Sequence, residues 1–248
     1  MNVRFLTVPF AALLALALGM AGPAPVRGDE LIVNGGSESG LSGWTVVNLP
    51  GGDGSFQPQS GLSSPVNGEP VPAPSEGSFA AMTDAQGPGS HVLYQDIFIP
   101  VGLTIAELRF DLFLGNREEA FYAPPTLDFG AAAFNQQARV DIIRTAADPF
   151  SLLPDDVLQT IYQTNPGDAT VSGYLTIVAD LGALLAAHGG ETLRLRFAQV
   201  DNVGPFQMGV DNVRLNAVPE PSTLLLYVSA GAILGATRLA GRRARRDD

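Results

Sequence analysis

The sequence predicts an all-β ectodomain, an antiparallel β-sandwich or jelly roll, followed by a single C-terminal transmembrane helix. Residues 192–200 place Leu193, Leu195 and Phe197 in alternation with Arg194 and Arg196, the period-2 pattern of a strand with one buried face. Similar short apolar stretches recur between turns rich in Gly, Pro, Asn and Asp, and helical periodicity is rare. We therefore expect the three apolar side chains in the core and the two arginines on the opposite face.

Nine segments have the composition and spacing of strands. They are Trp44–Val47, Ser78–Met82, His91–Ile99, Thr104–Leu114, Ala138–Arg144, Val157–Tyr162, Tyr174–Val178, Thr192–Val200 and Gln207–Ala217. The last segment adds Val210 and Val213 to the expected core, and Gly204-Pro205 forms the turn before it. One short helix is expected, with Asp180 as its N-cap, Leu181–Ala187 as its body and Gly189 at its end.

Two long stretches lack a strand pattern. Residues 49–77 are rich in Gly, Pro and Ser, and we expect them to run over the surface as a loop. Residues 115–137 contain four aromatic side chains, Phe121, Tyr122, Phe129 and Phe134, which we expect to pack this loop against the domain.

The first 28 residues are typical of a secretory signal peptide. Arg4 gives a positive start, residues 6–21 are apolar, and small residues follow at once. Cleavage after Ala21 and cleavage after Gly28 both fit the small-residue rule. The signal peptide predicts export and leaves residues 29–218 as the ectodomain.

Residues 219–248 combine a Pro-Glu-Pro segment, a membrane-length apolar stretch and a basic end. The 20 residues from Ser222 to Gly241 would span about 30 Å as a helix, which matches a hydrocarbon core. The arginines that follow predict a cytoplasmic C-terminus by the positive-inside rule, so the ectodomain lies outside. The basic end consists of Arg242, Arg243, Arg245 and Arg246.

This tripartite end resembles the PEP-CTERM sorting signal of Gram-negative bacteria that export polysaccharide. Pro219, Glu220 and Pro221 match the motif, and the four arginines match its basic end. The resemblance implies recognition and cleavage by exosortase, a membrane transpeptidase-like enzyme, after transient anchoring in the inner membrane. The protein would then reach the cell surface or the extracellular matrix. The alternative is an ordinary single-span anchor that follows a proline-rich linker.

Charge and cysteine content exclude several kinds of partner and chemistry. The ectodomain has seven arginines against 22 acidic residues, a net charge of 7 − 22 = −15, and the chain has no lysine. This excess argues against nucleic acid and against anionic membrane surfaces, and it is compatible with calcium or neutral sugar. Cysteine is absent although export is expected, so no disulfide supports the fold.

Both ends of the ectodomain resemble galactose-binding-like jelly rolls, which include many carbohydrate-binding modules. Residues 31–44 resemble the opening motif of that family, with a departure at Ser37, where the family has an aromatic core residue. Residues 209–215 resemble its closing strand. The resemblance implies a structural calcium ion bound by Glu38 and Asp211. Asp201, in a second Val-Asp-Asn-Val string, is the alternative to Asp211, and carboxylates without a metal are the alternative to both.

Signals of catalysis are weak in this chain. Without cysteine or lysine, and with His91 and His188 as its only histidines, the chain lacks zinc clusters, cysteine nucleophiles and lysine bases. We expect a non-catalytic surface or matrix protein that binds carbohydrate, such as the exported polysaccharide. The alternatives are a structural or adhesive envelope protein without a small ligand and, third, a hydrolase with a carboxylate pair.

Overall fold

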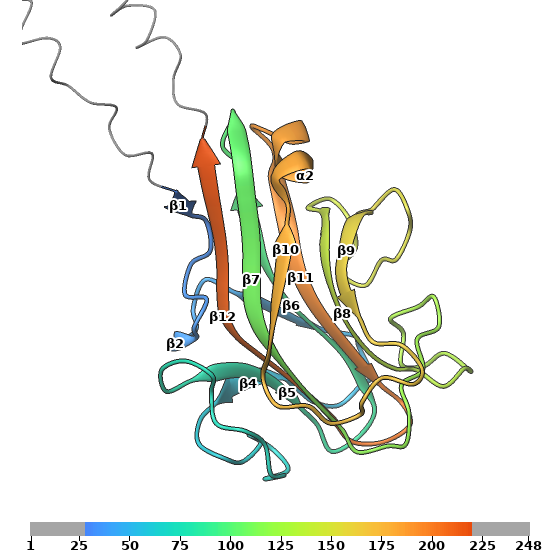
Figure 1. Cartoon of the computed structure of the whole chain (residues 1–248). Helices are drawn as coiled ribbons and strands as arrows, with labels where there is room; N and C mark the ends of the chain where they lie inside the picture. The colour runs from blue at the N-terminus through green and yellow to red at the C-terminus, as the bar shows by residue number, and fades with distance from the viewer. Residues whose placement is uncertain (1–27, 220–248) are drawn as a thin grey trace, which may run out of the picture.

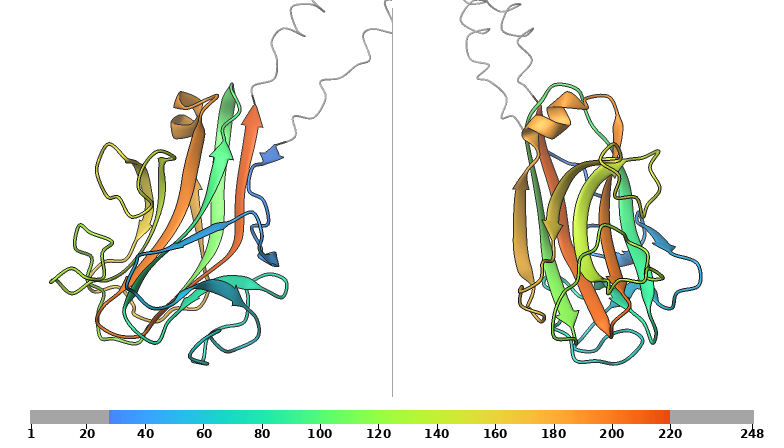
Figure 2. Two further views of the ribbon diagram at one scale, coloured as in Figure 1. Left: turned by 180° about the vertical axis from the view of Figure 1, so that it is seen from behind. Right: turned by 90° about the vertical axis from the view of Figure 1, so that its right-hand side faces the viewer.

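Two antiparallel β-sheets lie face to face in the computed structural model, which describes residues 28–219 (Figures 1 and 2). The strands are β1 (Asp29–Glu30), β2 (Glu38–Leu41), β3 (Thr45–Asn48), β4 (Ser55–Gln59), β5 (Ala80–Asp84), β6 (Gly89–Phe98), β7 (Leu103–Asn116), β8 (Gln136–Arg144), β9 (Val157–Gln163), β10 (Leu175–Asp180), β11 (Thr192–Asp201) and β12 (Phe206–Pro219). All nine predicted strands are present, within a few residues of the expected bounds. The predicted all-β sandwich is thus confirmed.

The first sheet has the strand order β10-β7-β12-β5-β4, and β1 pairs with β12 outside this path. The second sheet has the order β3-β6-β11-β8-β9. Strands that are neighbours in a sheet are mostly distant in sequence, as in jelly rolls, so the closing strand β12 lies inside the first sheet rather than at its edge.

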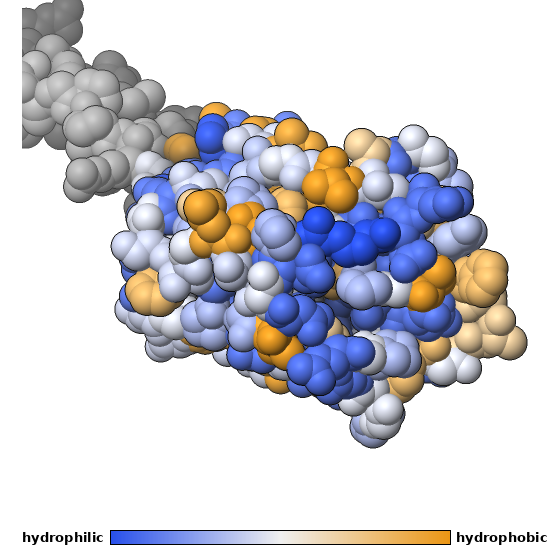
Figure 3. All heavy atoms as spheres, turned by 90° about the horizontal axis from the view of Figure 1, so that it is seen from below, coloured by the Kyte–Doolittle hydropathy of each residue, from blue (hydrophilic) through white to orange (hydrophobic). Residues whose placement is uncertain are grey.

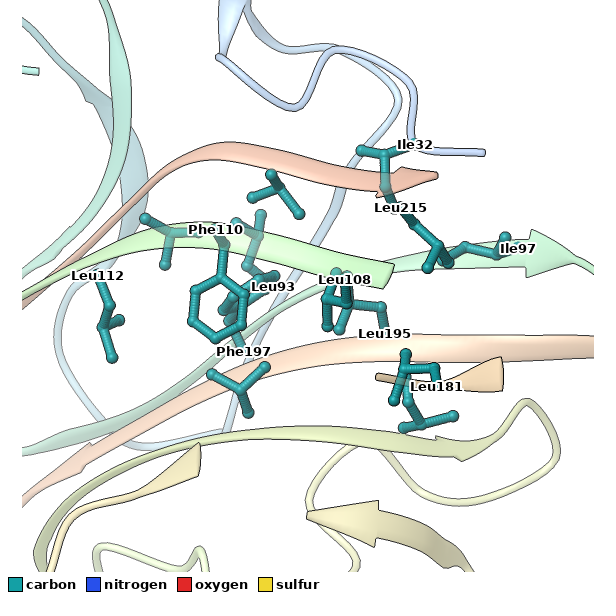
Figure 4. Packing of buried hydrophobic residues seen from close by; sticks show 14 of the residues in the cluster. Ile32, Leu93, Ile97, Leu108, Phe110, Leu112, Leu181, Leu195, Phe197 and Leu215 are labelled. Atoms are coloured by element: carbon teal, nitrogen blue, oxygen red, sulfur yellow. The ribbon is translucent and has the colours of Figure 1, made fainter. Parts of the chain in front are cut away.

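The core lies between the two sheets and contains the side chains predicted for it (Figure 4). Leu193, Leu195, Phe197, Val210 and Val213 are each at most 3% exposed. Leu108 and Phe110 on β7 meet Leu195 and Phe197 on β11 across this space. The described residues therefore supply a complete apolar core for one domain.

Arg194 and Arg196 lie on the outer face of β11, as the alternation predicts, but that face is not solvent-exposed. Arg196 is fully buried, because the loop before β9 covers it. Its guanidinium donates to the carbonyl oxygens of Pro149 and Ser151 (both 2.8 Å) and to Asp141 (2.6 Å). The ion pair with a fully buried carboxylate offsets part of the cost of burying the charge.

A bulge in β12 explains why the apolar positions of this strand change from even to odd numbers. Met208 and Val210 point into the core, the register with β7 shifts between Asp211 and Arg214, and Val213 is buried again. Asn212, with φ 50°, is the residue in the left-handed region at this shift. One extra residue thus restores the inward orientation of the following side chains.

Two expectations need correction. The segment 49–77 is not only a surface loop, because it contains β4, whose Phe56 is 3% exposed in the core. The short helix α2 comprises Gly182–Ala187 and begins one residue later than expected. Asp180 accepts a hydrogen bond from the Gly182 N–H (2.8 Å), but the glycine in the left-handed region after the helix is Gly190.

The aromatic side chains of residues 115–137 differ in exposure. Phe121 is fully buried and packs against Phe206, with ring centroids 5.5 Å apart. Phe129 packs partly buried against the outer face of the second sheet. Phe134 is 65% exposed. Within the described residues, the one aromatic ring that it packs against is Tyr122.

The first and last described strands meet at one end of the sandwich. Asp29 pairs with Ala217, so β1 begins where β12 ends (Figure 1). The β5–β6 and β11–β12 turns lie at the opposite end, because β12 runs antiparallel to both β5 and β7 from Phe206 onwards. The domain therefore has a terminal end and a loop end.

Candidate functional site

The opening motif forms a tight loop organised by Asn34. Its side chain donates to the carbonyl oxygens of Gly40 (3.0 Å) and Ser42 (2.9 Å) and accepts from the Ser39 N–H (3.1 Å). Its carbonyl oxygen accepts a hydrogen bond from Trp44 Nε1 (3.1 Å). Trp44 also packs against the core, so it stabilises the domain rather than offering an exposed platform.

The loop is fixed to the closing strand through Gly35. The Val213 N–H donates to the Gly35 carbonyl oxygen (3.0 Å), and any side chain at Gly35 would collide with the Val213 carbonyl group. Ser37, where the resemblance departs from its family, is 2% exposed and has φ 55°. The two ends of the ectodomain therefore meet, as the resemblance implies.

Glu38 and Asp211, the proposed calcium ligands, both hold the segment that precedes β5. Glu38 Oε1 accepts hydrogen bonds from the N–H groups of Ser78 (2.8 Å) and Phe79 (3.0 Å). Asp211 Oδ2 accepts from the Glu76 N–H (2.9 Å). The two carboxylates thus join the first loop, the closing strand and this segment through hydrogen bonds alone.

The side chains of Glu38 and Asp211 both pass near Gly36. A Cβ at Gly36 would lie 4.0 Å from both Asp211 Oδ1 and Glu38 Cγ. A hollow of about 380 Å³ beside them is also lined by Glu30 and Glu76. Within residues 28–219, no group of three or more His, Cys, Asp or Glu side chains is arranged to hold a metal ion. Two carboxylates of the right type are present, and calcium at this place stays a prediction.

The sorting motif and the basic end lie almost wholly outside the described residues. Glu220 and Pro221 lie outside them, and so do the arginines of the basic end, Arg242, Arg243, Arg245 and Arg246. Of the predicted signal peptide, residues 1–27 also lie outside the described residues. Pro219 is the last residue of β12, and its backbone is in register with Leu103. Among the described residues, no helix has the length and apolar character needed to cross a membrane.

The loop end carries a larger hollow, of about 420 Å³. It is lined by Asn67, Glu69, residues 85–88 and residues 201–205, three turns that are far apart in sequence. Hydrophilic residues gather around the hollowed middle of this face (Figure 3). The lining of the hollow thus combines polar and apolar surface.

Two carboxylates fix two of these turns. Asp84 accepts hydrogen bonds from the N–H groups of Val66 (2.7 Å) and Asn67 (2.8 Å), which holds the segment before Glu69. Asp53 Oδ2 accepts from the N–H groups of Gln86 (2.6 Å) and Gly87 (2.9 Å). Because their backbones are held by hydrogen bonds to side chains, these turns form a preorganised lining.

The third turn is held by amide side chains. Asn202 accepts from the Asn135 N–H (2.7 Å) and donates to the carbonyl oxygens of Phe129 and Ala133 (both 3.0 Å). These bonds attach the loop of residues 115–137 to the rim of the hollow. The exposed Phe134 lies in this loop between two residues that bond to Asn202.

Asp201 is the buried acid of the hollow, and it is 4% exposed. Burial raises the pKa of its carboxyl group to about 7, although Gln199 donates a hydrogen bond to Oδ1 (3.1 Å). On β6, the residue paired with Asp201 is Gly89, and His91 lies two residues further along the strand. His91 is 1% exposed, and burial lowers the pKa of its imidazole to about 4. Burial thus favours the neutral form of both groups.

Sequence reasoning placed Asp201 in a turn and considered it only as an alternative to Asp211. That placement is wrong by one residue, because Asp201 is the last residue of β11, and its burial has no signal in the sequence. The signal available for Asp201 itself was the repeated Val-Asp-Asn-Val string, whose two copies lie at the junction of β11 with the following turn and at the bulge within β12. Asp201 lies at the loop end, and Asp211 lies at the bulge on the outer face of the first sheet.

No protein-family model matches the sequence, and no curated protein matches it either. Solved structures with a similar fold include TmCBM61 in complex with β-1,4-galactotriose, at 9% identity and a TM-score of 0.44, over 75% of this chain and 97% of that one. The K3 cleaved adhesin domain of Lys-gingipain from Porphyromonas gingivalis W83 is 11% identical, with a TM-score of 0.44, over 75% and 98%.

The enzymatically active domain of tailspike protein 4 from bacteriophage CBA120 is also similar, at 10% identity and a TM-score of 0.43. The match covers 76% of this chain but only 21% of the tailspike chain. These three proteins differ in function, so the function of this chain is argued from its own residues.

Proposed function

We propose that this chain is an exported, non-catalytic surface or matrix protein whose ectodomain binds carbohydrate in the hollow at the loop end. The observation that carries the proposal is a preformed cleft with hydrogen-bonding groups, at the end of the sandwich opposite to the start of β1 and the end of β12. If the C-terminal segment anchors the protein, the cleft faces away from the membrane.

The lining suits a polyhydroxylated ligand. Glu69, Asp201 and the side chain of Gln86 offer hydrogen-bonding groups, and sugars are recognised through such groups on several sides. Sugar sites also use exposed aromatic rings, and Phe134 beside the rim, 65% exposed, is the ring best placed for that role. Trp44 is excluded from it by its packing.

A glycan array with the ectodomain of residues 29–218 tests the binding proposal. We expect retention of a polysaccharide or oligosaccharide, and weaker binding by Phe134→Ala. Phe98→Ala is the matched control, since Phe98 is 61% exposed but pairs with Thr192 at the terminal end. Absence of binding to any glycan would favour a structural or adhesive role without a ligand. Release of reducing ends from a bound glycan would favour the hydrolase alternative.

The route to the surface is part of the same proposal. We propose that a signal peptide within residues 1–28 directs export, that residues 222–241 anchor the chain transiently, and that an exosortase cleaves near Pro219–Pro221. Mass spectrometry of the mature protein should then find neither residues 1–21 nor the arginine cluster. An intact C-terminus in a strain with active exosortase would reduce this segment to an ordinary anchor.

A further inference from the structure

Two uncharged segments cap the end of the domain at which β12 finishes. Residues 97–106, which run from the end of β6 through the turn into β7, contain no ionisable side chain. Residues 181–190, which include α2, contain His188 as their one ionisable side chain. The ectodomain as a whole has 22 acidic residues and seven arginines, so this end differs from the rest of its surface. We call these two segments the uncharged cap.

The two segments of the uncharged cap form one continuous surface. The Ile99 N–H donates to the Glu191 carbonyl oxygen, and the Gly190 N–H donates to the Ile99 carbonyl oxygen (2.8 Å each). A Cβ at Gly189 would lie 3.2 Å from Val101 Cα, so the chain after α2 packs against the β6–β7 turn. Both lie at the same end of the sandwich as the end of β12 (Figures 1 and 2).

Three large apolar side chains of the uncharged cap are exposed to solvent. Val101, in the turn, is 73% exposed, Phe98 is 61% exposed and Ile105 is 59% exposed. Phe98 lies outside the second sheet, because its neighbours Ile97 and Ile99 point into the core, and Ile105 lies outside the first sheet. A protein docked on one sheet face would leave the other face uncovered. A bilayer that the end of the domain enters would cover all three side chains.

The chain leaves the domain beside this cap. Pro219 is in register with Leu103, and the Thr104 hydroxyl donates to the Val218 carbonyl oxygen (3.1 Å), so the end of β12 is held at the start of β7. Pro219 and Ser222, the first residue of the predicted span, are three residues apart, which is at most about 10 Å. If that span anchors the chain, the β6–β7 turn, which extends beyond Pro219, is held at the bilayer surface.

The nearest acidic residues lie beside or behind the uncharged cap. Glu107 is the first acid on β7, about 13 Å along the strand from its start. Asp29 on β1 is paired with Ala217, two residues before the end of β12. Glu191 borders the cap, where its carboxylate lies 3.0 Å from His188 Nδ1. An end-on contact with a bilayer therefore buries the apolar side chains first and leaves these acids at the level of the headgroups.

We propose that the uncharged cap lies in the interfacial layer of the bilayer while the chain is anchored. This inference rests on the proposed transient anchoring by residues 222–241. Contact of Phe98, Val101 and Ile105 with lipid removes apolar surface from water and holds the sandwich end-on to the membrane. The Pro-Glu-Pro motif then stays at the bilayer surface, where a membrane enzyme can reach it.

Lipid quenching of a single fluorescent label tests this contact. The chain has no cysteine, so Val101→Cys and Val171→Cys each create one labelling site in a chain of residues 29–248. Val171 is the matched control, because it is 50% exposed and pairs with Gly115 at the loop end. The chains are placed in phosphatidylcholine vesicles that contain a spin-labelled phosphatidylcholine as quencher. We expect at least about twofold stronger quenching of the label at 101, since interfacial segments lie about 5–10 Å deep.

Charged replacements in the uncharged cap separate contact with lipid from nearness to it. In the chain labelled at 101, Phe98→Asp together with Ile105→Asp should lower the quenching. Leu62→Asp together with Val171→Asp makes the same change in net charge away from the cap, at sites that are 69% and 50% exposed, and should leave the quenching unchanged. Equal quenching in these two double variants would overturn the contact.

The outcomes also separate this inference from the proposed anchoring, which flotation of the vesicles checks. A chain that floats with the vesicles but shows equal quenching at 101 and 171 overturns the contact of the cap and leaves the anchor intact. A chain that does not float with the vesicles overturns the anchoring, and the contact with it. Thermal unfolding of each labelled chain confirms that the replacements, all at exposed sites, preserve the fold.

Discussion

Asp111 on β7 and Asp211 on β12 face each other directly in the first sheet, and the Ser75 hydroxyl lies within hydrogen-bonding distance of both. The Ser75 Oγ atom is 2.8 Å from Asp111 Oδ2 and 3.0 Å from Asp211 Oδ2. A hydroxyl group has one hydrogen, so it can donate to only one of two ionised carboxylates. The second contact requires a proton on one carboxyl group or a cation nearby.

The surroundings indicate which carboxyl group ionises first. Burial raises the pKa of Asp211. Burial acts in the same direction on Asp111, but hydrogen bonds from Thr176, Ser75 and Asn212 outweigh it and lower the pKa of that group. Asp111 is therefore the stronger acid of the pair.

A double-mutant cycle with Asp111→Asn and Asp211→Asn measures the coupling between the two carboxyl groups. Like charges directly opposite in a sheet destabilise it, so each single replacement also relieves repulsion. In chelator, we expect Asp111→Asn to cost about 0.5–3 kcal/mol more in the Asp211→Asn background than in the wild type, measured by denaturant unfolding. A coupling of the opposite sign would show that the two groups stabilise each other.

The predicted calcium ion would bind Asp211 together with Glu38 rather than with Asp111. If Glu38 and Asp211 bind the ion, calcium at a hundredfold excess over its dissociation constant adds about 2.7 kcal/mol to the free energy of unfolding. Thermal unfolding with calcium and with chelator measures this, and Glu38→Gln and Asp211→Asn should remove the difference while Glu107→Gln keeps it. An unchanged midpoint in the wild type, after confirmed removal of metal, would leave the hydrogen bonds as the sole link between these segments.

Replacement of Phe197 tests whether this side of β11 faces the core. Its ring contacts Phe110 at 5.3 Å and Trp44 at 5.9 Å between centroids, both edge to face. Phe197→Ala should lower the free energy of unfolding by about 3–5 kcal/mol, through lost burial and the cavity left behind. The matched replacement Phe98→Ala, at a 61% exposed site, should change it by about 0.5 kcal/mol or less. Equal costs for the two variants would contradict the assigned faces.

His91 and Asp201 should give opposite dependences of stability on pH. The pKa of Asp201 is raised to about 7, so its contribution to stability is complete below its unfolded pKa and is lost as pH rises towards 7. The pKa of His91 is lowered to about 4, so its contribution is complete above 6.5 and is lost as pH falls towards 4. The two effects oppose each other between these limits.

Chemical denaturation from pH 4 to 7 measures this balance. Relative to the wild type, Asp201→Asn should become less stable on acidification by about 1.4 kcal/mol per pH unit, and His91→Gln should become more stable by a similar amount. The double variant should return to the wild-type slope. Parallel slopes in the wild type and both single variants would mean that neither group titrates as its burial indicates.

The strands could be predicted from sequence because their side chains alternate between a core and an outer face. The burial of Arg196 could not, since an arginine at an outer position normally indicates solvent. Its cover comes from Pro149 and Ser151, in a loop whose path is set by the fold rather than by a local pattern. β4 was missed because its neighbourhood is rich in Gly, Pro and Ser, and Phe56 alone marks it as buried.

The prediction that the two ends of the ectodomain meet came from a resemblance that covers both of them. The hollow at the loop end had no such signal. Glu69, Gln86 and Asp201 belong to three turns, and only the pairing of β5, β6, β11 and β12 brings them together. Polar residues in turns usually contact solvent, so their composition does not distinguish a ligand site from ordinary surface.

The position of β12 determines how the domain would carry a mechanical load. Its 14 residues, roughly 43 Å when extended, run from the loop end to Pro219, the first residue of the proposed cleavage motif. A pull between a polymer held at the loop end and whatever holds the C-terminal end of β12 would act along the strand. The hydrogen bonds between β12 and β7 would then bear the load at the same time and resist the sliding of one strand past the other. In a hairpin pulled apart from its open end, by contrast, the bonds break one after another. The fold thus suits a tether under tension.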